Sequence, residues 1–281
     1  MLEDPEFEFF LEGIKDRSIY TQKAYKTSYR KLREELGDSP IHEVDQSILV
    51  DIAKEVQNPH SRHAIINIAV IVRKLYDLPI TQLEVLRDIN KKDIEKRTRA
   101  KNKELKLPSY DDLIEHMNKK FDENKWTDYI INYLLINFQV RNQDLNFEVV
   151  KLKRDTKKNK EINYIWFNRT KGTALYIRNR YKTSGTYGVK ENEIDDKKFV
   201  TAIKRVMAHN NHGEEAGVFI PNDNAIAYHI KKATYKEIGE SSYVKIILDH
   251  FKADWEKHDE IARNRGTDIK TIRTYYNINK K

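Results

Sequence analysis

The sequence has no cysteine and no long hydrophobic run. The absence of cysteine excludes disulfides, thiolate metal sites and a cysteine nucleophile, and it fits a reducing compartment. No apolar run reaches the roughly 18 residues that a membrane span needs, and the acidic start Met1–Asp4 lacks the plan of a signal peptide. We therefore expect a soluble intracellular protein that does not bind a membrane.

What the sequence does have is charge, with 52 lysines and arginines against 44 acidic residues and a net charge of +8. Such an excess favours a polyanionic partner, because neutralised phosphates release their counterions. Charge alone does not separate this interpretation from a basic protein that is merely soluble. The apolar run from Tyr129 to Phe138 indicates a packed core.

Residues 6–90 have helical patterns and few glycines. Between Ser18 and Leu36, apolar side chains recur at steps of four, three and four, and Gly37 follows as a helix stop. A second amphipathic helix is expected from about Pro59 to Tyr76. Residues 1–90 are thus expected to form an all-helical domain.

Residues 91–106 carry eight basic and three acidic side chains and almost nothing to bury. This composition predicts a solvated linker between two domains. It also suits contact with a phosphate backbone, for which we name Arg97, Arg99, Lys101 and Lys103.

Residues 107–281 mix helices and strands. Ser109 is an expected helix cap, and a buried helix is expected at about 127–140, with Arg141 at its end. Four strands follow, with a glycine-containing turn between the last two, at 148–152, 162–167, 173–181 and 187–194. Helices return from about Lys197. The predicted fold is mostly helical α+β, with a small antiparallel sheet in the second domain.

The last helix is expected after the cap Thr267–Asp268 and carries the pair Tyr275 and Tyr276 near the end of the sequence. Two tyrosines near a terminus commonly serve only to pack against the protein. They become candidates for a nucleophile only if other parts of the chain supply groups for phosphoryl chemistry. Attack on a phosphodiester needs fixed cations for the phosphate oxygens, an acid for the leaving oxygen and a nucleophile. Arg141, at the end of a buried helix, is the candidate for a rigidly held cation. Lys182, at the tip of a hairpin, is the candidate for the acid. His209 and His212 lack a third metal ligand, and no cofactor is expected.

These features resemble the tyrosine recombinase (phage integrase) family, and in particular divergent members from large DNA viruses and their mobile elements. Arg141-Asn142-Gln143-Asp144-Leu145 is similar to the first arginine box of that family, and Tyr181-Lys182-Thr183 to its hairpin lysine. Gly266 precedes Tyr276 by ten residues, as the Gly-His box precedes the family's nucleophile. Lys245 lies near the place of the second arginine, and the helix start at Ser18 is similar to that of the family's core-binding domain.

The sequence departs from the family pattern at three positions. Ser242 stands where the family has His or Lys, Lys245 where it has arginine, and Thr267 where it has His. Lysine keeps the charge but loses the bidentate fork. Arg263, Arg265 and His250 flank the box and could compensate, although as helix-surface residues they are expected to be solvated or to face DNA.

Two assignments stay open within the resemblance. Lys171 competes with Lys182 as the hairpin lysine, and otherwise is expected to contact DNA. Tyr275 competes with Tyr276 as the nucleophile. We prefer Lys182 and Tyr276 on context and spacing.

The resemblance implies a DNA recombinase or integrase with a core-binding domain (1–90), a basic linker (91–106) and a catalytic domain (107–281). Tyr276 would form a 3′-phosphotyrosyl link without metal or cofactor, Arg141 and Lys245 would hold the phosphate, and Thr267 would add a hydrogen bond. Duplex DNA is the implied partner, with a tetramer on DNA, in a host cell or a virion. The alternatives are a DNA-binding or virion-associated protein that has lost activity, and a type IB topoisomerase-like enzyme.

Overall fold

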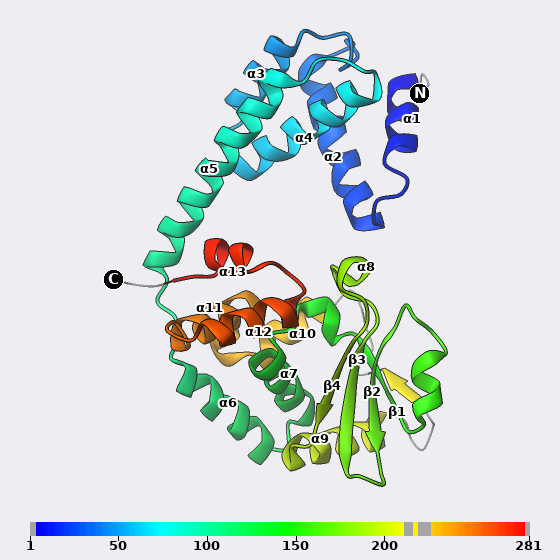
Figure 1. Cartoon of the computed structure of the whole chain (residues 1–281), viewed down its shortest axis with the longest axis vertical. Coiled ribbons are helices and arrows are strands. Elements are labelled where there is room, and N and C mark those ends of the chain that lie inside the picture. The colour runs from blue at the N-terminus through cyan, green and yellow to red at the C-terminus, as the bar shows by residue number, and fades with distance from the viewer. Residues whose placement is uncertain (1–3, 211–215, 219–225, 279–281) are drawn as a thin grey trace. The chain divides into compact units, whose positions relative to one another are not determined.

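A computed structural model describes residues 4–210, 216–218 and 226–278. The chain divides into two compact units, residues 1–100 and 101–281, and each is described here by itself. Among the described residues the fold is mostly helical with one small sheet, which confirms the predicted α+β class (Figure 1).

The first unit is built of helices. Its described elements are α1 (Pro5–Gly13), α2 (Ile19–Leu36), α3 (Gln46–Glu55), α4 (Pro59–Leu75) and the first turns of α5 (Thr81–Glu104). Helix α2 begins just after Ser18, where the sequence predicted a helix start, and the Ser18 side chain caps it by accepting a hydrogen bond from the backbone N–H of Thr21. Gly37 follows α2 with a φ of 61°, a conformation that favours glycine. Apolar faces of the four complete helices pack into one core.

The basic segment 91–106 is helical as far as Glu104, because α5 is one helix of 24 residues. The prediction of a solvated linker missed this helix. Lysine, arginine and glutamate are good helix formers, and Arg97 pairs with Asp93 one turn earlier at 3.0 Å. Two side chains of the segment are also buried, those of Ile94 and Asn102.

The second unit holds the sheet and the remaining helices. The described helices are α6 (Tyr110–Asp122), α7 (Trp126–Phe138), α8 (Ser184–Tyr187), α9 (Lys197–Asn210), α10 (Ile226–Ala233), α11 (Glu240–His250), α12 (Trp255–Arg265) and α13 (Ile269–Tyr275). The capping box predicted at Ser109 is confirmed, and so is the burial of the helix before Arg141. Helix α7 packs against α6, α9, α10, α11 and α12, which places it at the centre of this unit.

The described strands of the sheet are β1 (Phe147–Val150), β2 (Asn163–Asn168), β3 (Thr173–Arg178), β4 (Lys190–Ile194) and β5 (Ala216–Val218). Their order is β4-β3-β2-β1-β5. The expectation of a wholly antiparallel sheet was wrong, because β1 and β2 run parallel. The chain between them makes a crossover through the 3₁₀ helix η2 (Lys153–Lys157), as a parallel pair requires.

The hairpin of β3 and β4 is antiparallel and ends in the short helix α8 (Figure 1). Its register places Arg178 directly opposite Lys190. This pairing brings two cations to the same end of the sheet.

The end of the chain forms a small core of its own with α11 and α12. Asp268 caps α13 by accepting from the backbone N–H of Thr271, and Ile269, Ile272 and Tyr276 all contact this core, as the periodicity predicted. None of the described helices is both long and apolar enough to span a bilayer.

Candidate active site

Arg141 follows the buried helix α7 and caps the 3₁₀ helix η1 (Asn142–Leu145). Gln139 ends α7 in the left-handed conformation, which turns the chain sharply before Arg141. The Arg141 backbone N–H donates to Asp144 Oδ2 at 3.0 Å, and its Nη1 donates to the carbonyl of Arg265 at 2.5 Å. Burial lowers the pKa of Arg141, and the nearby charge of Arg265 lowers it further. Two guanidinium groups therefore lie close together.

Arg265 is the second of these cations, and it is buried, with 1% of its surface exposed. The expectation that it is a solvated helix-surface residue was wrong. Its Nη1 donates to the carbonyl of Gln139 at 2.9 Å, and its Nη2 forms an ion pair with Glu240 Oε1 at 3.0 Å. The carbonyl and the carboxylate come from α7 and α11, so tertiary packing rather than the pattern of α12 accounts for the burial. Arg263, by contrast, is exposed as expected.

The hydroxyl group of Tyr276 accepts a hydrogen bond from Arg265 Nη2 at 3.1 Å. The guanidinium carbon also lies 5.0 Å from the centre of the Tyr276 ring. The structure thus brings together Arg141, Arg265 and Tyr276, of which the sequence analysis had selected the first and the last.

A lysine also reaches this region, and it is Lys190 rather than Lys182 or Lys171. Lys182 is exposed at the end of the hairpin, and Lys171 is exposed in the turn between β2 and β3. Lys190 Nζ donates to the carbonyls of Arg263 and Asn264, the latter at 3.4 Å. Burial first, and then the charge of Arg178, lower its pKa to about 8. The sequence analysis missed Lys190, because its place depends on the register of β3 and β4 and on contacts with the end of α12, which no local sequence signal gives.

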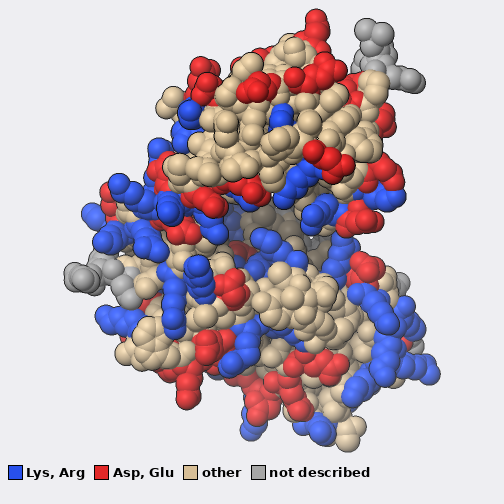
Figure 2. Space-filling model, turned by 45° about the horizontal axis from the view of Figure 1, so that its top comes forward, with Lys and Arg blue, Asp and Glu red and all other residues tan. Residues whose placement is uncertain are grey.

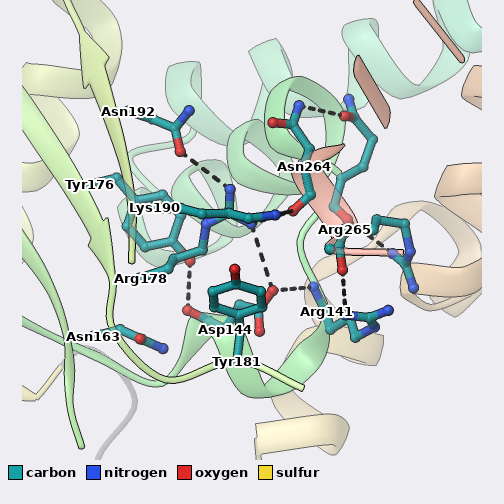
Figure 3. A network of polar contacts seen from close by, with 12 residues as sticks. Arg141, Asp144, Asn163, Tyr176, Arg178, Tyr181, Lys190, Asn192, Asn264 and Arg265 are labelled. Atoms are coloured by element: carbon teal, nitrogen blue, oxygen red, sulfur yellow. Dashed lines mark hydrogen bonds and ion pairs between the residues drawn. The ribbon is translucent and has the colours of Figure 1, made fainter. Parts of the chain in front are cut away.

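Arg178 and Asp144 form a buried pair beneath these groups (Figure 3). Arg178 Nη1 lies 3.8 Å from Asp144 Oδ2 and donates to the carbonyl of Asn264 at 2.8 Å, while its Nη2 donates to Asn192 Oδ1 at 3.2 Å. Burial raises the pKa of Asp144. Asp144 was recognised in sequence only as part of the Arg141 motif, and Arg178 was not anticipated.

The hairpin is fixed to the turn after α12 by further contacts. Thr183 Oγ1 donates to the carbonyl of Gly266 at 2.6 Å. Gly266 has a φ of 58°, and a Cβ atom there would collide with Thr183 and Tyr181. Only glycine fits both the backbone and the space, so Gly266 lets the hairpin and the C-terminal helices meet.

Lys245 and Thr267, the other expected members of the site, are placed differently. Lys245 Nζ donates to Asn102 Oδ1 at 2.8 Å, and the charge that acts on its pKa is that of Lys101, not Arg141. The structure therefore does not bring Lys245 to the position beside Arg141, where Arg265 lies instead. Thr267 is half-buried in the turn before α13, and its backbone N–H donates to the carbonyl of Ala262 at 3.0 Å. The carbonyl of Tyr275 accepts from Asn102.

Basic side chains gather at two exposed places. The cations Arg97, Arg99, Lys101 and Lys103 are exposed along α5. A second group lies on the crossover between β1 and β2, at the right-hand edge of the second unit in Figure 2. Its exposed members are Lys153, Arg154, Lys157, Lys158 and Lys160. The buried side chains of Asp155 and Thr156 anchor this basic turn, which the sequence analysis did not single out.

No cluster of three or more His, Cys, Asp or Glu side chains suited to a metal is found among the described residues. His212 lies outside those residues, and the side chain of His209 does too.

No family model matches this sequence, and no curated protein matches it. Among solved structures, the chain is similar to that of XerA recombinase, with 12% sequence identity and a TM-score of 0.39, over 98% of this chain and 94% of that one. At this low level of similarity, the function has to be argued from the site itself.

Proposed function

We propose that this protein cleaves and rejoins DNA strands through a covalent link between Tyr276 and a 3′-phosphate, as the resemblance to tyrosine recombinases implies. The observation that carries the proposal is the contact of the Tyr276 hydroxyl with the buried guanidinium of Arg265. The contact fixes the hydroxyl oxygen beside a cation, as attack on a phosphodiester requires. Arg141 supplies a second guanidinium next to the first.

The balance of charge around the tyrosine supports a phosphodiester as the substrate. The site holds four cations, Arg141, Arg178, Arg265 and Lys190, and the ion pairs seen there among the described residues are those of Arg178 with Asp144 and Arg265 with Glu240. Burial favours the neutral form of Asp144. Positive charge in excess and partly removed from water stabilises the charge that develops on the phosphate oxygens during attack.

In the proposed reaction, the Tyr276 oxygen bonds to phosphorus and its proton passes to solvent. The bond from phosphorus to the 5′-oxygen breaks, and that oxygen takes a proton from Lys190. Rejoining reverses the step: another 5′-hydroxyl attacks the phosphotyrosyl bond and releases Tyr276. Cleavage thus exchanges a DNA phosphodiester for a phosphotyrosyl diester, and rejoining restores a DNA phosphodiester. Lys190 suits the acid role because its pKa of about 8 lies near neutral pH.

This assignment revises the site proposed from sequence. Arg265 takes the place given to Lys245, and Lys190 the place given to Lys182. Tyr276 is preferred to Tyr275 because the Tyr276 hydroxyl contacts the guanidinium of Arg265. Thr267 remains a proposed donor to the phosphate. The exposed cations of α5 and Lys171 remain proposed DNA contacts.

One observation favours a second candidate, a DNA-binding protein that has lost activity. The Arg265 guanidinium already binds Gln139 and Glu240 within the protein. A guanidinium whose N–H groups already donate within the protein has fewer donors left to bind a phosphate.

A nicked suicide DNA substrate, which after cleavage loses the short fragment that carries the new 5′-hydroxyl, separates the candidates. A covalent adduct supports strand transfer, and DNA binding without adduct supports the inactive protein. Joining of the bound strand to a second duplex supports a recombinase. Relaxation of supercoiled plasmid without such joining would identify a topoisomerase-like enzyme.

A further inference from the structure

The backbone on both sides of Tyr276 is held by one buried side chain, that of Asn102. Its Nδ2 donates to the carbonyl of Tyr275 at 3.0 Å and to the carbonyl of Asn277 at 3.4 Å. Asn102 is 1% exposed and lies in the last turn of α5, within the second unit. The residue between the two carbonyls is the proposed nucleophile.

The other end of the Asn102 amide is held by Lys245. Lys245 Nζ donates to Asn102 Oδ1 at 2.8 Å and is half-buried, which lowers its pKa. A cation at Oδ1 fixes which end of the amide is the acceptor, so Nδ2 must face the tail. A hydrogen bond from a charged donor is also stronger than one between neutral groups.

Together these contacts form a chain from α11 through Asn102 to the residues flanking Tyr276. Helix α13 ends at Tyr275, so the tail beyond it has lost its helical support. The backbone N–H of Tyr276 still donates to the carbonyl of Ile272 at 3.0 Å. The carbonyls at the end of a helix lack partners within the helix, and Asn102 supplies one.

We propose that Asn102 and Lys245 are positioning residues that hold Tyr276 against Arg265. This inference rests on the proposed function for its catalytic meaning. It gives a reason for lysine at position 245, where the family that the sequence resembles has arginine. The Lys245 side chain would fix the C-terminal tail rather than the phosphate. Asn102 lies two residues past the boundary between the units, on the helix that crosses it.

The variants that test the pair are Asn102→Ala, Lys245→Met and Lys245→Arg. Asn102→Ala removes the donor to the tail, and Lys245→Met removes only the cation that orients the amide. Lys245→Arg keeps a cationic donor for Oδ1. The matched control is Asn90→Ala, because Asn90 lies on the same helix, is also 1% exposed and also donates to a carbonyl, that of Pro59.

The first readout does not depend on DNA cleavage. 3-Fluorotyrosine placed at position 276 gives one ¹⁹F resonance in the DNA-free protein, and hydrogen exchange is measured on the C-terminal peptide, both well below the unfolding temperature. Asn102→Ala and Lys245→Met are expected to shift or broaden the resonance and to speed exchange of the Tyr276 amide at least tenfold. Lys245→Arg and Asn90→Ala are expected to match the wild type.

The second readout is the rate of adduct formation at saturating DNA. Asn102→Ala should lower this rate roughly 10- to 100-fold, with DNA affinity changed less than twofold, because displaced reactants lose rate rather than binding. An unchanged resonance and unchanged exchange in both Asn102→Ala and Lys245→Met would overturn the inference. If the wild type forms no adduct while the resonance responds, the proposed function fails and the positioning role stands.

Discussion

The guanidinium of Arg265 lies both against the ring and at the hydroxyl of Tyr276, with Nη2 3.1 Å from the hydroxyl oxygen. Ten residues of sequence separate the two, and the turn at Gly266 brings them together. The same guanidinium pairs with Glu240. One buried side chain thus stabilises the fold and faces the proposed nucleophile, and both roles can be measured.

Replacing Arg265 by alanine is expected to destabilise the protein strongly. The change leaves the Glu240 carboxylate, whose side chain is only 14% exposed, without its cation. Breaking a buried ion pair in this way costs roughly 3–5 kcal/mol. Urea unfolding measures the loss, and Arg263→Ala, on the exposed side of α12, is the control and should change stability by less than about 0.5 kcal/mol. Equal stabilities of the two variants would show that the ion pair does not support the fold.

Gly266→Ala is expected to separate the hairpin from the C-terminal turn. The new Cβ would lie 2.7 Å from a ring carbon of Tyr181 and would also collide with Thr183, at a φ that disfavours alanine. We expect a loss of roughly 1–3 kcal/mol in the free energy of unfolding. Gly172→Ala is the control, since Gly172 has a positive φ of 66° and open space around it. The prediction fails if Gly266→Ala is no more destabilising than this control.

The acid role of Lys190 predicts a pH dependence. Below its pKa of about 8 the side chain is an ammonium that can donate a proton, and above it the side chain is an amine. Cleavage should therefore slow as pH rises through about 8. A substrate with sulfur in place of the bridging 5′-oxygen needs no proton, because a thiolate leaves unaided. Lys190→Ala should cleave that substrate nearly as fast as the wild type, yet lose roughly 10²- to 10⁴-fold on ordinary DNA.

An equal loss of rate on both substrates would exclude the acid role of Lys190.

The lowered pKa of Lys190 also has a consequence for stability. Since the ordinary pKa is 10.5, the unfolded chain binds this proton more tightly than the folded chain does between pH 8 and 10.5. The contribution of Lys190 to stability should therefore rise with pH across that window and be at its least favourable below about pH 8.

The cations of α5 are expected to carry phosphate contacts. Replacing Arg97, Arg99, Lys101 and Lys103 by glutamine should weaken DNA binding and flatten its dependence on salt. Each lost phosphate contact lowers the slope of log affinity against log salt by about 0.9. Four glutamines at Lys153, Arg154, Lys157 and Lys160 remove the same charge from the crossover turn. A larger change of slope in this second variant would place the DNA there instead.

The sequence predicted elements whose signals are local. Ser109 and Asp268 cap helices as expected, because a cap is decided by a few adjacent residues. The register of β3 and β4 and the parallel pairing of β1 and β2 were not predicted, since they depend on how distant segments meet.

The same distinction separates the site residues. Arg141 and Tyr276 were found because each belongs to a short motif with fixed spacing. Arg265 was assigned to a solvated surface because α12 is polar overall. The sequence of α12 gives no sign that Arg265 would bind Gln139 and Glu240, which lie elsewhere in the chain. Lys190 was missed because its partners lie on β3 and α12.

The central claim is that Tyr276 attacks DNA, and the most direct test is to trap and map the adduct. Wild type, Tyr276→Phe and Tyr275→Phe are each incubated with the nicked suicide substrate, and the bound peptide is identified by mass spectrometry. We predict an adduct at Tyr276 in the wild type and in Tyr275→Phe, and none in Tyr276→Phe. An adduct that persists in Tyr276→Phe, or DNA binding by the wild type without any adduct, would contradict the account.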